Sequence, residues 1–334
     1  MIDVLYHKNC CDGFTAAWLF GASNLLVADI DMEFHAVQYG HPPPELRPGS
    51  AVLILDFSYP RDVLERLADE GHAVVVLDHH ESAQKDIDVE PRFPAPPPLG
   101  AALFNRVPPG VYVEFDMTRS GAMMALDWIR TPISKEALRT DLPELDVSIV
   151  QLVQDRDLWQ WKYGDRTRGL HAWLTSGPFT FERWNYADDN LEEVVQEGLA
   201  LVKYRHQLIC DIAIPGVRVG TVEPWDHLVG AFVNGPSKLA SDLCDFVLTH
   251  CKGLARPPDY AVCYSISPDG ELYGSIRSRD IAVNVADIAR AFGGGGHARA
   301  AGFKITTQLP RIDWCPEATD EWRELFKSNP VSTN

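Results

Sequence analysis

Three short apolar segments near the start of the chain predict strands of a parallel sheet. They are residues 2–7 (IDVLYH), 51–57 (AVLILDF) and 72–80 (HAVVVLDHH). Their apolar residues are continuous rather than alternating with polar ones, which is typical of strands buried on both faces. Helical patterns lie between them, at 12–22 (DGFTAAWLFGA) and 58–71 (SYPRDVLERLADEG). This alternation of strand and helix predicts an α/β fold with a parallel sheet.

From about residue 214 the pattern changes to shorter strand-like segments separated by turn signals. Examples are YAVCYSIS at 260–267 and LYGSIRS at 272–278, and VNVADIARAF at 283–292 is a helix candidate. This pattern of short strands, turns and a helix predicts a second, smaller α/β domain. We therefore divide the chain into an N-terminal domain at 1–175, a helical connector or insertion at 176–213, a smaller α/β domain at 214–310 and a tail at 311–334.

Composition narrows the class of protein. The apolar fraction of 46% fits a folded globular chain, and the longest apolar runs are far too short to span a membrane. No basic segment followed by an apolar one opens the chain, so we expect a cytoplasmic protein with no membrane partner. Seven scattered cysteines predict reduced thiols rather than a disulfide framework. The net charge of −17 argues against binding along duplex nucleic acid.

Each of the three predicted strands ends in side chains that bind metals. The ligand set is His7, Asp12, Asp56, Asp78, His79 and His80, followed by Asp155 after the apolar SIVQLVQ, with Asp157 two residues later. The carboxyl ends of parallel strands share one edge of a sheet, so these side chains should converge. Carboxylates with imidazoles suit manganese or magnesium, and zinc less well. Two such ions would clamp a phosphate and activate a water molecule.

A structural role is the alternative for single residues of this set. Asp56 alone could cap a helix. Adjacent side chains on extended backbone point to opposite sides, so one of His79 and His80 can bind a metal while the other contacts substrate or packs. Because all three predicted strands end in residues that can bind metals, the sequence favours a metal site.

A glycine-rich segment, FGGGGHARAAGF at 292–303, is the second chemical signal. Its backbone amides can surround an anion, although a helix end followed by a flexible turn would use the same glycines. Residues 275–304 carry five Lys or Arg (277, 279, 290, 299, 304) against two acids (280, 287), a net charge of +3 in an acidic chain. This local excess favours an anion pocket.

These motifs resemble those of the DHH phosphoesterase superfamily. LDHH at 77–80 matches its namesake motif, YHKNCCDG at 6–13 its first motif, LDF at 55–57 its second and VQDRD at 153–157 its fourth. The segment 283–303 is similar to the signature of the associated C-terminal domain, DHHA1. The resemblance spans about residues 1–310 and implies a metal-binding catalytic domain joined to a DHHA1 substrate-binding domain.

The resemblance also implies roles for individual residues. The metal centre would contain His7, Asp12, Asp56, Asp78, His79 and Asp155, with Asp56 bridging two ions and His80 beside it. Asp78, His79 and His80 would take part in catalysis. The substrate would be held by Arg277, Ser278, Asn284, Gly293, Gly294, Gly295, Gly296 and His297. Manganese is the expected ion, with magnesium or zinc as alternatives.

Cys10 departs from the family pattern, because the first motif usually carries an aspartate at this position. We include Cys10 among the metal ligands as a thiolate, although manganese prefers oxygen. Cys10 and Cys11 lack the CxxC spacing of redox sites, which disfavours a thiol redox role.

The leading hypothesis is a metal-dependent phosphodiesterase that hydrolyses short single-stranded oligonucleotides or small cyclic or linear dinucleotides by two-metal water activation. A phosphatase or pyrophosphatase acting on nucleotide or inorganic phosphates is the enzymatic alternative. The second alternative is a non-catalytic nucleotide-sensing protein, because Cys10 stands where the family usually has an aspartate. The oligomeric state is left open, a homodimer included.

Overall fold

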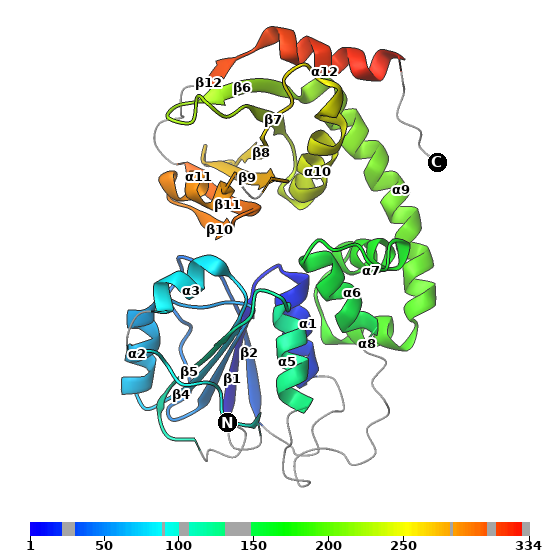
Figure 1. Ribbon diagram of the computed structural model, residues 1–334. Coiled ribbons are helices and arrows are strands. Elements are labelled where there is room, and N and C mark those ends of the chain that lie inside the picture. Colours follow the sequence, from blue (N-terminus) through cyan, green and yellow to red (C-terminus); the bar gives the residue numbers. More distant parts are fainter. Residues whose placement is uncertain are drawn as a thin grey trace. The chain divides into compact units, whose positions relative to one another are not determined.

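The chain divides into two compact units, Met1–Val202 and Lys203–Asn334. The computed structural model describes residues 1–21, 31–88, 91–99, 107–130, 148–280, 283–305 and 312–328. Each unit combines one sheet with helices (Figure 1), and the sheet of the N-terminal unit is parallel. The predicted α/β class with a parallel N-terminal sheet and a smaller C-terminal α/β region is confirmed. The finer division into four segments stays a prediction.

The described strands of the N-terminal unit form one five-stranded sheet in the order β2-β1-β3-β4-β5, in which every pairing is parallel. They are β1 (Ile2–His7), β2 (Met32–Val37), β3 (Ala51–Leu55), β4 (Ala73–Asp78) and β5 (Gly110–Phe115). The three strands predicted from apolar runs are therefore present as β1, β3 and β4. They occupy the centre of the sheet, where both faces are covered.

Two layers of helices cover this sheet (Figure 1). They are α1 (Cys11–Gly21) and α5 (Gly121–Arg130) on one face, and α2 (Arg61–Asp69) and α3 (Glu81–Ile87) on the other. Along β3, Leu53 and Leu55 join the apolar cluster of α1 and α5, whereas Val52 and Ile54 join that of α2 and α3. Burial on both faces explains why the apolar runs are continuous.

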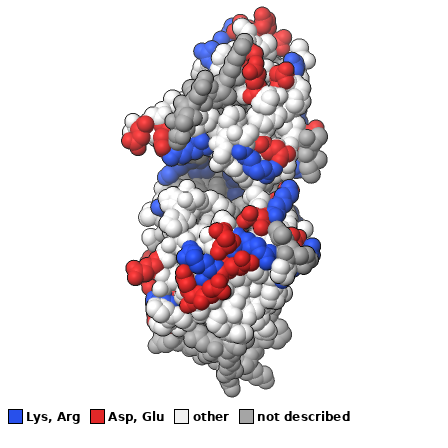
Figure 2. Space-filling view, turned by 90° about the vertical axis from the view of Figure 1, so that its left-hand side faces the viewer, with Lys and Arg blue, Asp and Glu red and all other residues white. Residues whose placement is uncertain are grey.

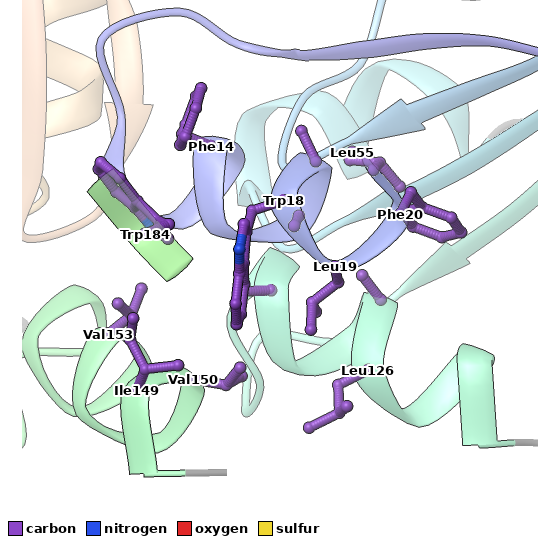
Figure 3. Packing of buried hydrophobic residues seen from close by; sticks show 14 of the residues in the cluster. Phe14, Trp18, Leu19, Phe20, Leu55, Leu126, Ile149, Val150, Val153 and Trp184 are labelled. Carbon is purple, nitrogen blue, oxygen red and sulfur yellow. The ribbon is translucent and has the colours of Figure 1, made fainter. Parts of the chain in front are cut away.

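A group of helices extends the core of the N-terminal unit. They are α6 (Ser148–Asp157), α7 (Asp165–Thr175), α8 (Phe181–Asp189) and the first part of α9 (Leu191–Gly216), which continues past Val202 into the C-terminal unit. Trp184 of α8 is fully buried, lies 4.6 Å from Phe14 between ring centroids and donates from its indole nitrogen to Thr15 Oγ1 at 2.8 Å. Figure 3 shows Trp184, Ile149 and other apolar side chains packed around helix α1. The segment read as a helical insertion thus contributes directly to the packing of α1.

The described strands of the C-terminal unit form a seven-stranded sheet in the order β10-β11-β9-β8-β7-β6-β12. They are β6 (Arg218–Val222), β7 (Gly230–Asn234), β8 (Tyr260–Ile266), β9 (Leu272–Ser278), β10 (Gly295–His297), β11 (Ala300–Ile305) and β12 (Ile312–Trp314). Only the β7–β8 pairing is parallel among these strands. This mixed sheet carries the glycine-rich segment at one edge.

Helices cover both faces of the second sheet as well. They are α10 (Ala240–His250), α11 (Val285–Ala291) and α12 (Pro316–Ser328), with short 3-10 turns η1 (Ser237–Leu239) and η2 (Cys251–Gly253) flanking α10. Trp322 of α12 is fully buried and donates from its indole nitrogen to Ala213 O and Ile214 O, both at 3.1 Å. The region read as a tail therefore contributes a core side chain.

Among the described helices, none is both long enough and apolar enough to cross a membrane. The outer face of the N-terminal unit formed by α2 and α3 carries interleaved acidic and basic side chains (Figure 2). Arg61 pairs with Glu65 at 2.8 Å, Arg66 with Glu70 at 3.1 Å and Lys85 with Glu81 at 2.6 Å. Such exposed pairs add little to stability.

Candidate metal centre

The carboxyl ends of three neighbouring strands and the start of α1 bring the predicted ligands together. His7 ends β1, Asp56 follows β3 directly and Asp78 ends β4. Asp12 lies in the first turn of α1. The turn from β4 to α3 supplies the two histidines that follow Asp78. The convergence expected from a parallel sheet is present in the structure.

Two groups of ligand atoms lie close enough to hold metal ions. One contains His7, Asp56 and His80 and the other contains Asp12, His79 and Asp157, with the ligand atoms of each group within 4.8 Å of one another. Asp56 contacts both groups, because its Oδ2 lies 3.7 Å from His7 Nδ1 and its Oδ1 lies 3.1 Å from His79 Nε2. This carboxylate lies where an ion of either group could share it.

The backbone at Asp56 is held in an unusual conformation. Its φ is +54°, in the left-handed region that non-glycine residues rarely adopt. Its N–H donates to Leu77 O at 2.9 Å, so the residue still belongs to the β3–β4 ladder. Backbone strain of this kind persists where surrounding packing enforces it and is common at functional sites.

Asp12 is fixed by the N-terminus of a second helix. Its two carboxylate oxygens accept from the backbone N–H of Gly121 at 2.5 Å and of Ala122 at 3.1 Å, at the start of α5. Helix N-termini favour anions, so this contact holds the carboxylate in place. The close approach requires a glycine, since a Cβ at 121 would lie 2.5 Å from Asp56 Cβ. Sequence reasoning did not foresee Gly121.

Asp78 shapes the turn that presents the two histidines. Its Oδ1 accepts from the backbone N–H of His79 at 2.7 Å and of His80 at 3.2 Å, and lies 2.7 Å from His80 Nδ1. These contacts orient the His80 ring. Asp78 therefore lies beside the two ligand groups, with one oxygen engaged by the turn.

The donor atoms fit a divalent cation. His7 Nδ1, Asp56 Oδ2 and Asp78 Oδ2 are buried and have no hydrogen-bond partner among the described residues. Leaving such atoms unsatisfied costs roughly 1–3 kcal/mol each. Within the same described ranges, Asp12, Asp56 and Asp78 form ion pairs only with histidines. A cation bound here would satisfy these atoms and offset the charge.

A third acidic group in the same unit provides a contrast. Asp3, Glu33 and His35 also place ligand atoms within 4.8 Å of one another. Arg47 lies among them, with its Nε 3.1 Å from Asp3 Oδ1 and 3.6 Å from Glu33 Oε2. This group already pairs with an arginine, whereas, among the described residues, the carboxylates of the two ligand groups form ion pairs with histidines.

Cys10 lies among the carboxylates of the centre. Burial raises the pKa of its thiol well above the ordinary value, and the negative charges of Asp56, Asp157 and Asp12 raise it further. A bound cation would oppose both effects, because metal ions favour the thiolate. The role of Cys10 as a ligand stays a prediction.

The metal-free centre retains protons. Burial opposes ionisation of Asp56, but the imidazoles of His7 and His79 hold its pKa well below the ordinary value. Burial raises the pKa of Asp12 well above its ordinary value, and the nearby carboxylates add to this. Despite burial, Asp56 and Asp157 raise the pKa of His79 to about 10. His79 and Asp12 must therefore lose protons when they bind an ion.

Binding of Mn²⁺ is expected to release protons and to tighten as the pH rises from about 6 to about 9. The sign follows from the raised pKa values of His79 and Asp12, because the ion competes with protons for these groups. Isothermal titration calorimetry in two buffers with different ionisation enthalpies measures the protons released. Equal heats in both buffers and a pH-independent affinity would contradict this expectation.

Asp155 and Asp157 have different surroundings. Asp155 accepts from Lys162 N at 2.7 Å, Tyr163 N at 3.2 Å and Thr167 Oγ1 at 2.5 Å, so both its oxygens fix the turn before α7. Asp157 Oδ2 instead lies 3.4 Å from His79 Nε2. The structure brings Asp157 into the ligand groups and does not bring Asp155 there. The VQDRD segment alone could not separate these two carboxylates.

Substitution of the two aspartates should separate stability from metal binding. We expect Asp155→Ala to lower the free energy of unfolding by about 2–4 kcal/mol, because it leaves the buried Thr167 hydroxyl and two backbone N–H groups of the turn without their acceptor. Asp157→Ala should leave the metal-free protein nearly as stable and reduce its bound metal. Urea denaturation of the metal-free proteins and metal analysis of the loaded ones provide the two readouts. The reverse pattern would assign the ligand to Asp155.

The predicted substrate residues of the C-terminal unit are partly engaged by the protein itself. Arg277 donates to Ile276 O at 2.9 Å, Ala301 O at 3.2 Å and Ser241 Oγ at 2.8 Å, and burial lowers its pKa. Ser278 Oγ donates to the backbone at Val283 O at 2.8 Å. These two side chains build the end of β9.

Asn284 and the glycines that follow it begin and end helix α11. The Asn284 side chain accepts from Ala286 N at 3.1 Å, which is a helix N-cap. Gly293 has a φ of +75° and its N–H donates to Arg290 O, while Gly294 N donates to Ala289 O, which is the pattern of a helix C-cap. Gly295, Gly296 and His297 form β10 against β11. A role in binding anions stays a prediction.

The basic residues near this loop are mostly paired. Arg279 pairs with Asp245, Arg290 with Asp287 and Lys304 with Glu271. Arg299 is exposed and forms no ion pair among the described residues. The net positive charge of residues 275–304 is therefore partly offset by Asp245 and Glu271, which lie outside that segment.

Comparison with known proteins gives one family match and several distant likenesses. Residues 250–328 match the sequence model of the DHHA1 domain. The uncharacterized protein R106 of Acanthamoeba polyphaga mimivirus is 25% identical over 324 residues, which are 91% of this chain and 67% of the relative.

Three solved structures match this chain at low sequence identity. A pGpG-specific phosphodiesterase from Vibrio cholerae has a TM-score of 0.39 at 14% identity and covers 98% of each chain. An exopolyphosphatase-related protein from Bacteroides fragilis has a TM-score of 0.38 at 12% identity, covering 98% of this chain and 91% of its own. An uncharacterized Helicobacter pylori protein has a TM-score of 0.35 at 14% identity, covering 98% and 99%.

Proposed function

We propose that the chain, whose residues 250–328 match the DHHA1 domain model, belongs to the DHH phosphoesterase superfamily and acts as a metal-dependent phosphodiesterase on short oligonucleotides or small cyclic or linear dinucleotides. The observation that carries the proposal is the cluster of histidines and carboxylates at the strand ends, with buried donor atoms that lack protein partners. Such a cluster is suited to hold divalent cations next to a phosphate.

Two ligand groups would hold the ions. His7, Asp56 and His80 form one and Asp12, His79 and Asp157 form the other. When bound, divalent cations stabilise charge on a phosphoryl group and activate water as a nucleophile. Manganese suits the oxygen and nitrogen donors, with magnesium or zinc as alternatives.

The protein positions these ligands before any substrate arrives. Asp78 holds the His80 ring through the 2.7 Å contact to Nδ1, and helix α5 holds Asp12 through two backbone N–H groups. Groups fixed in this way need little reorganisation during the reaction, which is the main source of electrostatic catalysis. We propose that Asp78 acts as a positioning residue and that His79 and His80 bind at the centre.

Substrate recognition is assigned to the C-terminal unit by the same proposal. Arg277 and the glycine-rich loop at 293–297 would contact the phosphate or the sugar or base of the substrate. The net charge of −17 disfavours a long nucleic acid, since an acidic surface repels extended polyanions. A dinucleotide or short oligonucleotide carries only a few charges and needs only a local cationic site.

Substrate screening and metal analysis on the same preparation test the proposal. The purified chain is loaded with Mn²⁺, Mg²⁺ or Zn²⁺ and incubated with dinucleotides, cyclic dinucleotides, short RNA and DNA, and pyrophosphate. Release of nucleoside monophosphates supports a phosphodiesterase. Orthophosphate released from pyrophosphate or from a 3′-phosphorylated nucleotide, with dinucleotides left intact, would assign a phosphatase instead. Tight binding of dinucleotides without product would assign nucleotide sensing.

A further inference from the structure

Tyr39 is an exposed aromatic residue at the edge of the sheet that carries the metal centre. It follows β2, which pairs with β1 in parallel so that Val37 lies opposite His7. Tyr39 is 43% exposed. Neither the sequence motifs nor the proposed mechanism assigns it a role.

The Tyr39 ring contacts the histidines of one ligand group. Its centroid lies 5.5 Å from that of His7 and 5.8 Å from that of His80, both with edge-to-face geometry. These two histidines come from different strands, β1 and the turn after β4, and both share a ligand group with Asp56. Tyr39 therefore lies directly beside the candidate metal site.

Buried aromatic packing holds the ring from one side. Phe57 is 1% exposed and lies 4.5 Å from Tyr39 between centroids, and Tyr59 packs behind Phe57 at 4.9 Å. Contacts with three rings fix the orientation of Tyr39, while the residue as a whole stays 43% exposed. Its hydroxyl end is buried near the carboxylates of the centre, and burial raises its pKa. A ring that is fixed and still exposed resembles a preformed binding surface, because its entropy of ordering is already lost.

The chemistry of the ring selects the group that would bind it. A neutral aromatic face cannot bind a phosphate, which belongs with the metal ions. It can stack on a flat aromatic group, and a nucleobase attached to the scissile phosphate through its sugar is such a group. The exposed ring beside the ligands thus fits the nucleoside part of a nucleotide.

We propose that Tyr39 is a specificity-determining residue whose exposed face stacks on the nucleobase next to the scissile phosphate. This inference rests on the proposed function, since it assumes a nucleotide substrate at the metal centre. Base stacking on aromatic side chains contributes roughly one order of magnitude or more in affinity per base. Loss of the ring should therefore weaken binding of the substrate more than it slows the chemical step.

The test compares Tyr39→Ala and Tyr39→Phe in the Mn²⁺-loaded full chain, with a dinucleotide and its abasic analogue as substrates. We expect Tyr39→Ala to raise KM for the dinucleotide about tenfold and to change kcat by less than about threefold. Tyr39→Phe keeps the stacking ring but removes a hydroxyl that is buried near Asp78 and Asp56, so it should keep the wild-type KM for the dinucleotide. For the abasic analogue, the wild type should already have the high KM, because no base is present to stack. Tyr39→Ala should not raise that KM further. Tyr204→Ala, at a tyrosine that is 66% exposed on α9, is the matched control.

Binding without turnover separates this inference from the proposed function. Calorimetric titration of the same nucleotides with Ca²⁺ in place of Mn²⁺ measures affinity whether or not the protein hydrolyses them. A weaker affinity of Tyr39→Ala for the dinucleotide alone supports stacking, even if no product forms in the activity assay. Equal affinities of Tyr39→Ala and wild type would overturn it. A parallel fall in metal content and in kcat for both substrates would also overturn it, because that pattern indicates a structural role.

Discussion

Replacement of Asp56 by asparagine is expected to reduce hydrolysis of a dinucleotide by about a thousandfold or more and to lower the bound metal. Asp56 is the residue that contacts both ligand groups, through Oδ2 to His7 and Oδ1 to His79. The amide has nearly the same shape but lacks the charge that offsets a cation. A thousandfold loss corresponds to about 4 kcal/mol of transition-state stabilisation, within the range for metal catalysis. Steady-state kinetics and metal analysis of the loaded variant measure both effects.

A surface variant controls for the loss of one negative charge. Glu70→Gln removes a carboxylate that pairs with Arg66 on the exposed face of α2, outside the candidate centre. It should retain wild-type activity and metal content. Full activity of Asp56→Asn would show that the candidate centre is not the site of hydrolysis. Lost activity with full metal content would assign Asp56 a role in the chemical step without a role in metal retention.

Replacement of Gly121 by alanine should destabilise the protein and disturb the metal centre together. Helix propensity alone predicts a gain of up to about 1 kcal/mol for this change at the start of α5. The new Cβ, however, would lie 2.5 Å from Asp56 Cβ and 2.8 Å from Asp56 Cα. Overpacking against backbone typically costs about 1–3 kcal/mol. We therefore expect a net loss of about 1 kcal/mol in the free energy of unfolding, measured by urea denaturation.

Gly216→Ala is the matched control for this substitution. Gly216 also lies at a helix end, and a Cβ there would meet only Val233 Cγ2 at 3.9 Å. We expect its unfolding free energy to stay within about 0.5 kcal/mol of wild type. A stabilising effect of Gly121→Ala would show that the backbone around Asp56 yields easily. Retained metal affinity in that variant would show that α5 does not need to approach Asp12 so closely.

The centre of the N-terminal sheet could be predicted from the sequence because its strands are buried on both faces. β1, β3 and β4 are continuous apolar runs, whereas the edge strand β2 has a mixed burial pattern that no simple period describes. β5 is likewise only partly buried along its length.

The part of the candidate site that lies at the strand ends could be predicted from the sequence. His7, Asp56 and the turn at 78–80 converge because parallel strands place their carboxyl ends at one edge. The choice of Asp157 over Asp155 depends on which carboxylate the turn before α7 engages. Both residues lie in the last turn of α6, so their positions in the sequence do not reveal it. Gly121 and Tyr39 come from segments without a motif, so only the folded structure brings them to the centre.

The candidate metal centre is assembled from residues as far apart in sequence as His7 and Asp157. An unfolded chain cannot hold these donors together, so the ion would bind the native state and not the denatured ensemble. By mass action, each tenfold rise in free ion above its dissociation constant would then add about 1.4 kcal/mol of stability per site. The supply of divalent metal would thereby set how much of this protein survives heat and proteolysis, in addition to how fast it works.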